Sequence, residues 1–211
     1  MALSAEETKA FYAAWAARFA AEREALIALD GKVGDSDLGI TMSKGFAAAN
    51  ESVALLEGAS ISGQMKAAGS ALAKAAPSTM GTLMATGFLR GFKALESAEH
   101  FGTAEAASFW RAFAEGVAQR GKAQLGDKTV LDVLDPIAAA LEGSDADLAG
   151  ALDAAVKAAA EALDATKDMV AQHGKAAAFQ EKSRGLPDAG GTVALILIEV
   201  MRDVACAAER G

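Results

Sequence analysis

The sequence predicts an all-α protein, and three observations carry this prediction. About a quarter of the 211 residues are alanine, which has the highest helix propensity of all residues. Proline occurs only 3 times, and the aromatic residues that strands prefer make up 6% of the chain. Apolar residues also recur at spacings of three and four, as they do on the buried face of a helix.

The first expected helix covers residues 4–27. Ser4 followed by Glu7 has the form of a capping box, which marks a helix N-terminus. Aromatic residues then recur at spacing four from Phe11 to Phe19. This spacing predicts an aromatic stripe on one buried face of the helix.

A glycine-rich break follows at residues 31–39, and helical periodicity then resumes through Met42, Phe46 and Val53. Five further helical stretches are expected after this one. They lie near residues 61–76, 80–95, 103–121, 129–142 and 145–172.

The last of these stretches has a cap at Ser144 or Asp147, and a polar stretch at residues 173–188 follows it. Apolar positions from Val193 to Val204 then fit the i, i+3, i+4, i+7 pattern of a final helix. The Leu-Ile-Leu-Ile run inside this helix is also compatible with a buried strand, but no second strand is expected to pair with it.

The connections between these helices are mostly short, so consecutive helices are expected to pack antiparallel. The predicted architecture is therefore an eight-helix up-and-down bundle or barrel. No linker and no change of composition divides the chain, which predicts one domain covering residues 1–211.

The chain is acidic, with 20 Lys and Arg residues against 28 Asp and Glu residues and a formal net charge of −8. It contains no block rich in Lys and Arg. Nucleic-acid surfaces and anionic-membrane surfaces both need clustered positive charge, so neither partner is expected. An anionic ligand would need metal ions, helix N-termini or a few local cations.

Cys206 is the only cysteine, and the N-terminus has no basic segment followed by an apolar one. We therefore expect neither an internal disulfide nor export, and we expect a cytoplasmic protein. The longest strongly apolar run, Val193 to Ile198, is far shorter than the roughly 20 residues of a membrane helix.

An acidic loop places three carboxylates, Asp30, Asp35 and Asp37, among three glycines. Such crowding of like charges is costly unless a cation neutralises it. An EF-hand is excluded because Ile40 stands where that loop needs glycine and Phe46 stands where it needs glutamate. The absence of nearby Cys and His disfavours zinc, which leaves magnesium held together with a phosphate ligand. The alternative is a solvated turn in which Asp35 or Asp37 caps the next helix.

Two further loops lie at predicted helix ends. The segment Pro77–Thr82 begins a helix, where free N–H groups and hydroxyls can hold phosphate oxygens. The segment Arg120–Val130 approaches the P-loop pattern. Asp127 is inserted between Gly126 and the lysine, however, and no strand precedes the segment. A P-loop NTPase is therefore excluded.

The charged, glycine-bounded segment from Gly174 to Gly191 is long for a connection in a compact domain, and such segments are commonly lids. We expect the part from Lys175 to Gly190 to be a mobile lid that orders over a ligand. His100 and His173 stand singly, with no partner suggested by spacing, and both are expected to be surface histidines.

These segments, in this order and spacing, resemble the nucleotide-binding L subunit of dihydroxyacetone kinases, the DhaL or DAK2 family. The resemblance covers essentially the whole chain. The most specific matches are Asp30-x4-Asp35-x-Asp37-x-Gly39, Arg120-Gly121-Lys122-Ala123 leading into Gly126-Asp127-Lys128-Thr129, and Gly185-x2-Asp188-x-Gly190. The resemblance implies a barrel of eight antiparallel helices that binds ADP or ATP at one end through two Mg²⁺ ions.

The same resemblance assigns the site residues. It makes Asp30, Asp35 and Asp37 the metal ligands. It places Leu38, Gly39, Ile40, Thr41, Thr79 and Met80 along the phosphates, with Ser78, Thr79 or Thr82 supplying a hydroxyl. It places Gly121 and Val130 at the adenine, and Lys175, Asp188, Ala189 and Gly190 in the closing loop.

The sequence also departs from the family pattern. Beside the metal triad, Leu38 stands where the family usually has histidine, and Thr41 stands where it usually has asparagine. Met80 stands where the family usually has the serine of the phosphate loop. Lys175 and Lys182 stand where the family usually has two lid arginines. The lysines keep the positive charge but cannot bind a phosphate in the bidentate geometry of arginine. The usual proline after Asp188 is Ala189. These departures indicate a divergent branch.

The resemblance implies half of a kinase. The nucleotide-binding chain would transfer a phosphoryl group to a ketose that a separate K subunit holds. The donor is left open between exchangeable ATP and a bound ADP recharged by a phosphotransferase-system phosphoprotein, and a homodimer is also left open. The alternative is a non-catalytic regulator that binds a magnesium nucleotide.

Overall fold

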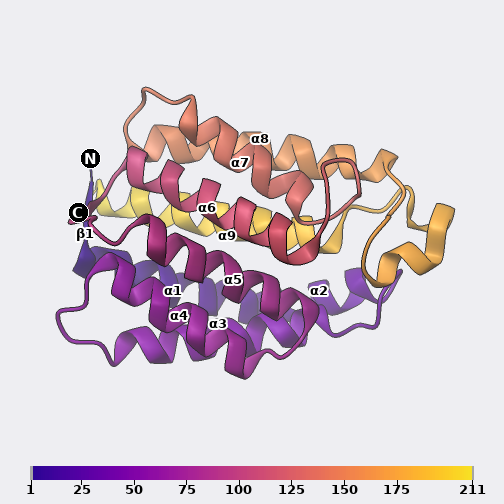
Figure 1. Cartoon of the computed structure of the whole chain (residues 1–211), viewed down its shortest axis with the longest axis horizontal. Helices are drawn as coiled ribbons and strands as arrows, with labels where there is room; N and C mark the ends of the chain where they lie inside the picture. Colours follow the sequence, from indigo (N-terminus) through magenta and orange to yellow (C-terminus); the bar gives the residue numbers. More distant parts are fainter. Residues whose placement is uncertain (1, 211) are drawn as a thin grey trace.

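The computed structural model describes residues 2–210, and its architecture is helical almost throughout (Figure 1). This confirms the all-α prediction. The α-helices are α1 (Ala5–Ala21), α2 (Arg23–Asp30), α3 (Leu38–Ala54), α4 (Ile61–Ala75), α5 (Thr79–Ala94), α6 (Thr103–Gly121), α7 (Leu131–Glu142), α8 (Leu148–Ala165) and α9 (Ala189–Ala208). Two 3₁₀ segments, η1 (Thr166–Asp168) and η2 (Lys175–Ser183), lie between α8 and α9.

The eight longer helices form a closed ring. Apart from α2, each helix packs against the next in the chain, and α1 packs against both α3 and α9 to close the ring. The helices run up and down along one axis, so the two termini lie at one end (Figure 1). The connections at residues 31–37, 76–78, 122–130 and 166–188 therefore gather at the opposite end.

Local capping signals set several helix starts as the sequence predicts. The capping box of Ser4 and Glu7 is present at α1, where the Ser4 hydroxyl accepts the Glu7 N–H and the Glu7 carboxylate accepts the Ser4 N–H. Asp147 caps α8, where its carboxylate accepts the N–H of Gly150 at 3.0 Å. These side chains satisfy backbone donors that a helix N-terminus leaves free.

The helix expected at residues 4–27 is two helices. The backbone of Glu22 (φ −83°, ψ 0°) ends α1, and α2 then turns to pack against α3. Gly39 permits this packing, because a Cβ there would lie 2.0 Å from the carbonyl oxygen of Arg23. The tertiary contact with α3 therefore overrides the local helical pattern.

The helix expected at residues 145–172 also ends early, at Ala165. The fully buried Thr166 donates its hydroxyl to the carbonyl of Leu163 at 2.6 Å and accepts the N–H of Asp188 at 2.9 Å. The chain continues through η1 and leaves the helix axis. A single buried threonine thus joins the end of α8 to the start of α9.

The sequence did not predict the short strand pair β1 (Leu3–Ser4) and β2 (His100–Phe101). The two strands pair antiparallel, with Leu3 opposite Phe101. Elements of two residues have no periodicity that a sequence pattern can reveal. The pair ties the start of the chain to the connection between α5 and α6.

The core is a cluster of aromatic rings along the barrel axis. Trp15, Phe46 and Phe88 lie within 6.2 Å of one another, measured between ring centroids, mostly in tilted or edge-on geometry. Phe113 joins them at 5.6 Å from Phe88, which leaves room for no Cβ at Gly87. Trp15, in the predicted aromatic stripe from Phe11 to Phe19, is therefore a packing residue.

The Leu-Ile-Leu-Ile run lies inside α9 and is helical. Ile196, Leu197 and Ile198 are all buried, so this helix is apolar over most of its circumference. Because it is covered from several sides, its apolar residues form a continuous run that also resembles a buried strand. Within residues 2–210, no helix combines the length and the apolar character that crossing a membrane requires.

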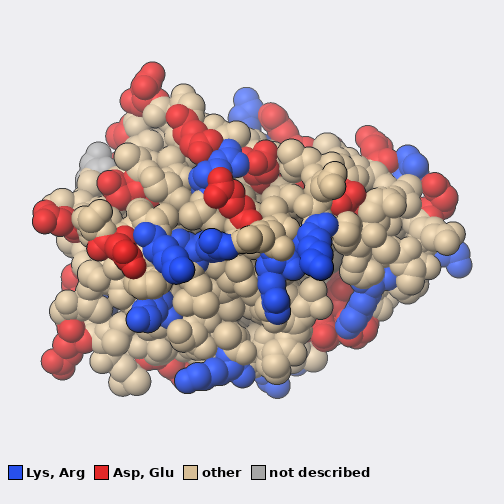
Figure 2. Space-filling model, in the orientation of Figure 1, with Lys and Arg blue, Asp and Glu red and all other residues tan. Residues whose placement is uncertain are grey.

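The fold gathers basic residues that are scattered in the sequence. Figure 2 shows basic side chains across the middle of the face formed by α4, α5 and α6, and acidic side chains along the upper edge over α7 and α8. α4 and α5 carry no acidic residue. The basic residues of the three helices are Lys66, Lys74, Arg90, Lys93, Arg111 and Arg120.

Candidate functional site

A cavity of about 390 Å³ opens at the end of the barrel where the long connections gather. Its walls come from the acidic loop after α2, the start of α5, the end of α6, the loop before α7, the segment after η1 and the start of α9. A more polar hollow of about 790 Å³ adjoins it and shares Asp37, Thr79 and Lys175 with it.

The acidic loop brings its three carboxylates together. Asp30, Asp35 and Asp37 each offer an oxygen, and these oxygens lie within 4.8 Å of one another. One Asp30 oxygen accepts the N–H groups of Asp37 at 3.0 Å and of Leu38 at 3.4 Å, which folds the loop back on the end of α2. A Cβ at Gly34 would lie 2.1 Å from the other Asp30 oxygen. The glycine therefore makes room for the first carboxylate.

The electrostatics of this cluster favour a cation. Burial, with the nearby Asp30 carboxylate adding to it, raises the pKa of Asp37 above its ordinary value. Lys175 of η2 forms an ion pair with Asp35 and lies 3.8 Å from Asp37. Three carboxylates without nitrogen or sulfur ligands form a hard-oxygen set, which fits Mg²⁺.

The start of α5 lies on the cavity wall. Ser78 caps the helix, and its hydroxyl oxygen accepts the N–H of Gly81 at 3.1 Å. A Cβ at Gly81 would lie 2.0 Å from the carbonyl oxygen of Ala76, so only glycine allows this tight turn. Because Ser78 serves as the cap, Thr79 and Thr82 are better placed to offer a hydroxyl to a ligand.

One wall of the cavity is apolar. Leu83 of α5, Val117 of α6 and Val130 and Leu131 at the start of α7 line it together with Gly121. Apolar and small side chains of this kind accommodate a flat aromatic ring. The cavity thus joins a polar, acidic side to an apolar side.

The start of α9 forms the remaining wall. Asp188 caps the helix, with a carboxylate oxygen 2.6 Å from the N–H of Gly191. Burial raises the pKa of Asp188 to about 7, the hydrogen bond from Gly191 opposes this, and the Asp132 carboxylate adds to it. A Cβ at Gly190 would lie 2.6 Å from the Cε of Met80, so the two walls meet at this glycine.

The structure brings most of the residues predicted for the site to this one place. The cavity is lined by Asp30, Asp35, Asp37, Leu38, Ser78, Thr79, Met80, Gly121, Val130, Lys175, Asp188, Ala189 and Gly190. Thr82 lines the adjoining hollow.

Three predicted phosphate-side residues lie elsewhere. Gly39, Ile40 and Thr41 follow Leu38 in the first turn of α3 but, unlike Leu38, do not line the cavity. Gly39 faces the backbone of α2, and Thr41 is 8% exposed. Their assignment to the phosphates stays a prediction.

Sequence reasoning missed several polar residues. His173 was expected to have no partner, but its Nε2 lies 3.0 Å from Asp127, and both residues come from connections at the site end. Asp132 accepts the N–H groups of Gly126 at 2.6 Å and of Thr129 at 2.7 Å. The spacing of Thr129 and Asp132 is a local capping signal, whereas nothing in the sequence pairs His173 with Asp127.

Comparisons with known proteins identify the family of this chain. A family model described as the DAK2 domain matches residues 32–203. The chain is 32% identical over 186 residues to the "PEP-dependent dihydroxyacetone kinase, ADP-binding subunit DhaL" of Escherichia coli, and the match covers 87% of this chain and 89% of that protein. It is 33% identical to the D-erythrulose kinase of Mycolicibacterium smegmatis, covering 94% of this chain but 35% of that protein.

A solved structure shares the fold. The crystal structure of the dihydroxyacetone kinase of C. freundii in complex with AMP-PNP and Mg²⁺ superimposes with a TM-score of 0.69 at 19% identity. The match covers 96% of this chain and 34% of that chain. The sequence and the fold together show that this protein belongs to the DAK2 domain family, with the E. coli kinase subunit DhaL among its relatives.

Proposed function

We propose that the chain is the nucleotide-binding subunit of a two-component ketose kinase. The single observation that carries this proposal is the arrangement at the end of the barrel. There, the carboxylates of Asp30, Asp35 and Asp37 lie in one cavity with the N-terminus of α5 and with an apolar wall. A nucleoside di- or triphosphate has a matching division into a charged end and a flat ring.

The acidic loop would hold Mg²⁺ ions. Asp30, Asp35 and Asp37 are the residues that would bind them, because their oxygens already converge. When bound, Mg²⁺ neutralises negative charge on phosphate oxygens and on a phosphoryl group in transfer. In the structure, the ammonium of Lys175 neutralises part of the negative charge of these carboxylates, since it pairs with Asp35.

Other residues of the chain would position the phosphates of the nucleotide. The N-terminus of α5 lies on the cavity wall, where free backbone N–H groups of a helix can bind phosphate oxygens, and Thr79 and Thr82 add hydroxyls that can do the same. Lys175 and Arg120 line the polar hollow beside them and add positive charge. Phosphoryl transfer depends mainly on such positioning and charge stabilisation.

The acceptor and the partner follow from the relatives. The E. coli relative is named as a subunit of a dihydroxyacetone kinase, and the M. smegmatis relative is named as an erythrulose kinase. The first supports a separate subunit that holds the acceptor, and the two together support a small ketose. The donor is either ATP or an ADP that a phosphoprotein recharges, as the phosphoenolpyruvate dependence in the E. coli name suggests.

Reconstitution tests this proposal. The purified chain is mixed with a K-type ketose-binding subunit and with dihydroxyacetone or erythrulose. One reaction contains ATP, and another contains phosphoenolpyruvate with the phosphotransferase proteins and ADP. Mass spectrometry measures the ketose phosphate. We expect product only when both subunits are present, and no product when the chain carries Asp37→Ala.

Two results would contradict parts of the proposal. Phosphorylation of free ketose by the isolated chain would contradict the need for a partner. Absence of product with both donors, although the chain binds a magnesium nucleotide, would favour the regulator that the sequence left as the alternative.

A further inference from the structure

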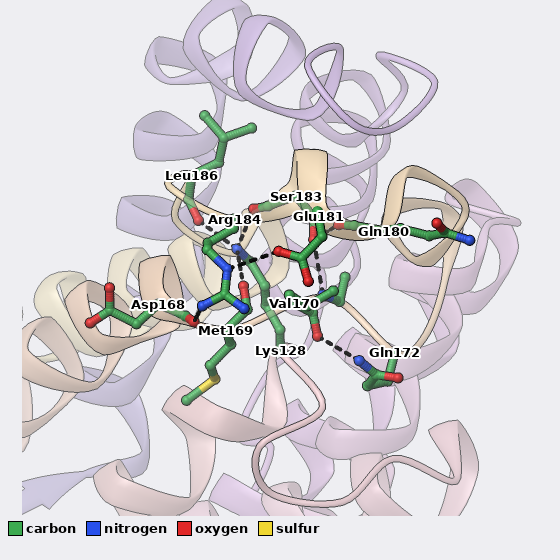
Figure 3. A network of polar contacts seen from close by, with 11 residues as sticks. Lys128, Asp168, Met169, Val170, Gln172, Gln180, Glu181, Ser183, Arg184 and Leu186 are labelled. Carbon is green, nitrogen blue, oxygen red and sulfur yellow. Dashed lines mark hydrogen bonds and ion pairs between the residues drawn. The ribbon is translucent and has the colours of Figure 1, made fainter.

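A buried ammonium joins two connections at the site end of the barrel. Lys128 precedes α7 and is only 3% exposed, with φ at +58°. Its Nζ donates to the carbonyl oxygens of Met169 at 3.2 Å, Leu186 at 2.8 Å and Ser183 (Figure 3). An ammonium has three N–H donors, so these three carbonyls satisfy it fully.

The three carbonyls lie on both sides of one excursion of the chain. Met169 precedes residues 170–182, and Ser183 and Leu186 follow them. We call the two backbone segments that flank residues 170–182 the stems of this excursion. One side chain from a different connection therefore holds the two stems together. Figure 3 shows the Lys128 ammonium between these stems.

Further hydrogen bonds close the same stems. The N–H of Ala171 donates to the hydroxyl of the fully buried Ser183 at 3.0 Å, and the N–H of Gly185 donates to the carbonyl of Lys167 at 2.8 Å. Arg184 donates to the carbonyl of Asp168 at 2.7 Å (Figure 3). The stems are thus bonded at several points, but only the Lys128 ammonium is bonded to three carbonyls at once.

The excursion carries residues that line the cavity. Lys175 lies within it and reaches Asp35, and Asp188 follows Leu186 by two residues and caps α9. The positions of both therefore depend on where the stems are held. Lys128 also lies on the cavity wall itself.

Loss of this ammonium would destabilise the stems locally. A buried carbonyl that loses its donor loses the free energy of a hydrogen bond and gains no water in exchange. Substitution of Lys128 by an apolar residue would leave the carbonyl of the buried Ser183, and the part-buried carbonyls of Met169 and Leu186, without this donor. The local backbone would then separate until water reached them, while the rest of the ring would remain packed.

We propose that Lys128 is a positioning residue of the nucleotide site, a buried cationic clamp that fixes the stems of residues 169–186 and so places Lys175 and Asp188 at the cavity. The effect on ligand binding rests on the proposed function, whereas the clamp itself does not. The clamp limits any lid motion to residues 170–182. The lid expected from the sequence runs from Lys175 to Gly190, so the clamp would exclude its last part, residues 183–190, from the motion.

The first test uses the full chain with Lys128→Met, which keeps a long unbranched side chain but removes the ammonium and its charge. Lys167→Met is the matched control, because Lys167 is exposed and pairs only with Asp164 across one helical turn. Hydrogen exchange without nucleotide reports on the stems, circular dichroism and thermal unfolding report on the barrel, and calorimetry measures ADP affinity with Mg²⁺.

For Lys128→Met we expect faster amide exchange confined to residues 169–186, retained helical content and at least tenfold weaker ADP binding. The control should match the wild type in all three measurements. Unchanged exchange and unchanged affinity in the folded Lys128→Met variant would overturn the proposal. If the wild-type chain binds no nucleotide, the proposed function fails, but the exchange measurement still decides whether the clamp exists.

A second variant separates charge from space filling. Lys128→Gly tolerates the positive φ and leaves room for n-butylammonium, which replaces the lost side chain, or for n-butanol, its neutral counterpart. We expect n-butylammonium, and not n-butanol, to restore both exchange protection and ADP affinity. Equal rescue by the two compounds would overturn the role of the charge. Global unfolding of both variants without recovery in n-butylammonium would assign Lys128 to the fold alone.

Discussion

The ammonium of Lys175 forms an ion pair with the carboxylate of Asp35, and it lies 3.8 Å from Asp37. The pair joins η2 to the acidic loop, and both residues line the cavity. A lysine therefore partly neutralises the carboxylates that the proposed function assigns to Mg²⁺. A metal ion has to compete with this lysine for Asp35, and the released ammonium would then be available to a phosphate.

Lys175→Met should change the affinities for metal and nucleotide in opposite directions. Without the competing ammonium, Mg²⁺ alone should bind about threefold more tightly, the size expected of an exposed ion pair. ADP with Mg²⁺ should bind more weakly, because the variant lacks one positive charge that would contact the phosphates. Calorimetry measures both affinities. Lys32→Met removes an equal charge from the same loop region without an ion pair and should change neither by a comparable amount.

Nucleotide binding should require Mg²⁺, because the carboxylates of Asp30, Asp35 and Asp37 would otherwise repel the phosphates. Calorimetry with ADP should show binding in Mg²⁺ and none in EDTA. Asp37→Ala should abolish binding and leave the helical circular dichroism intact, since one fewer carboxylate reduces repulsion in the empty loop. Asp145→Ala, which removes an exposed carboxylate far from the loop, should behave as wild type. An ADP affinity that survives chelation would refute the metal role of the triad.

Gly34→Ala should weaken the site without disrupting the barrel. The new Cβ would lie 2.1 Å from an oxygen of the Asp30 carboxylate and 2.7 Å from its carbonyl oxygen, so the carboxylate or the loop must shift. We expect roughly tenfold weaker binding of ADP with Mg²⁺, about 1.4 kcal/mol. Gly143→Ala is the matched control, because a Cβ there would meet nothing closer than 3.5 Å. Equal affinities in the two variants would contradict the predicted importance of this close approach.

Asp188→Asn should change how stability depends on pH. The pKa of Asp188 is about 7 in the fold against an ordinary 3.8, so between these values the folded chain keeps a proton that the unfolded chain releases. The free energy of unfolding therefore falls as pH rises from about 4 to 7, by at most about 4 kcal/mol from this group. An asparagine can still accept the Gly191 N–H but carries no charge.

Urea unfolding of the nucleotide-free protein between pH 4 and pH 8 measures this effect. The variant should gain stability over the wild type as pH rises, with most of the gain complete near pH 7. Curves for the two proteins that stay parallel over this range would show that the Asp188 carboxyl titrates normally in the fold.

Local signals explain why much of the fold could be predicted. The capping box at Ser4 and the cap at Asp147 act within one helical turn, and their sequence spacing reveals them directly. The aromatic stripe from Phe11 to Phe19 follows the same rule and is buried as expected. The acidic loop was also legible, because its carboxylates lie within eight residues of one another.

The sequence by itself determined the helical class, most helix positions and the clustering of Asp30, Asp35 and Asp37, since each depends on residues near one another in the chain. Only the tertiary structure decided the break between α1 and α2, the Lys175–Asp35 pair and the three carbonyls around Lys128. Backbone carbonyls occur at every residue, so no sequence pattern marks those that a lysine will bind. These contacts join connections that meet only when the ring of helices closes, and closure depends on packing along the whole chain.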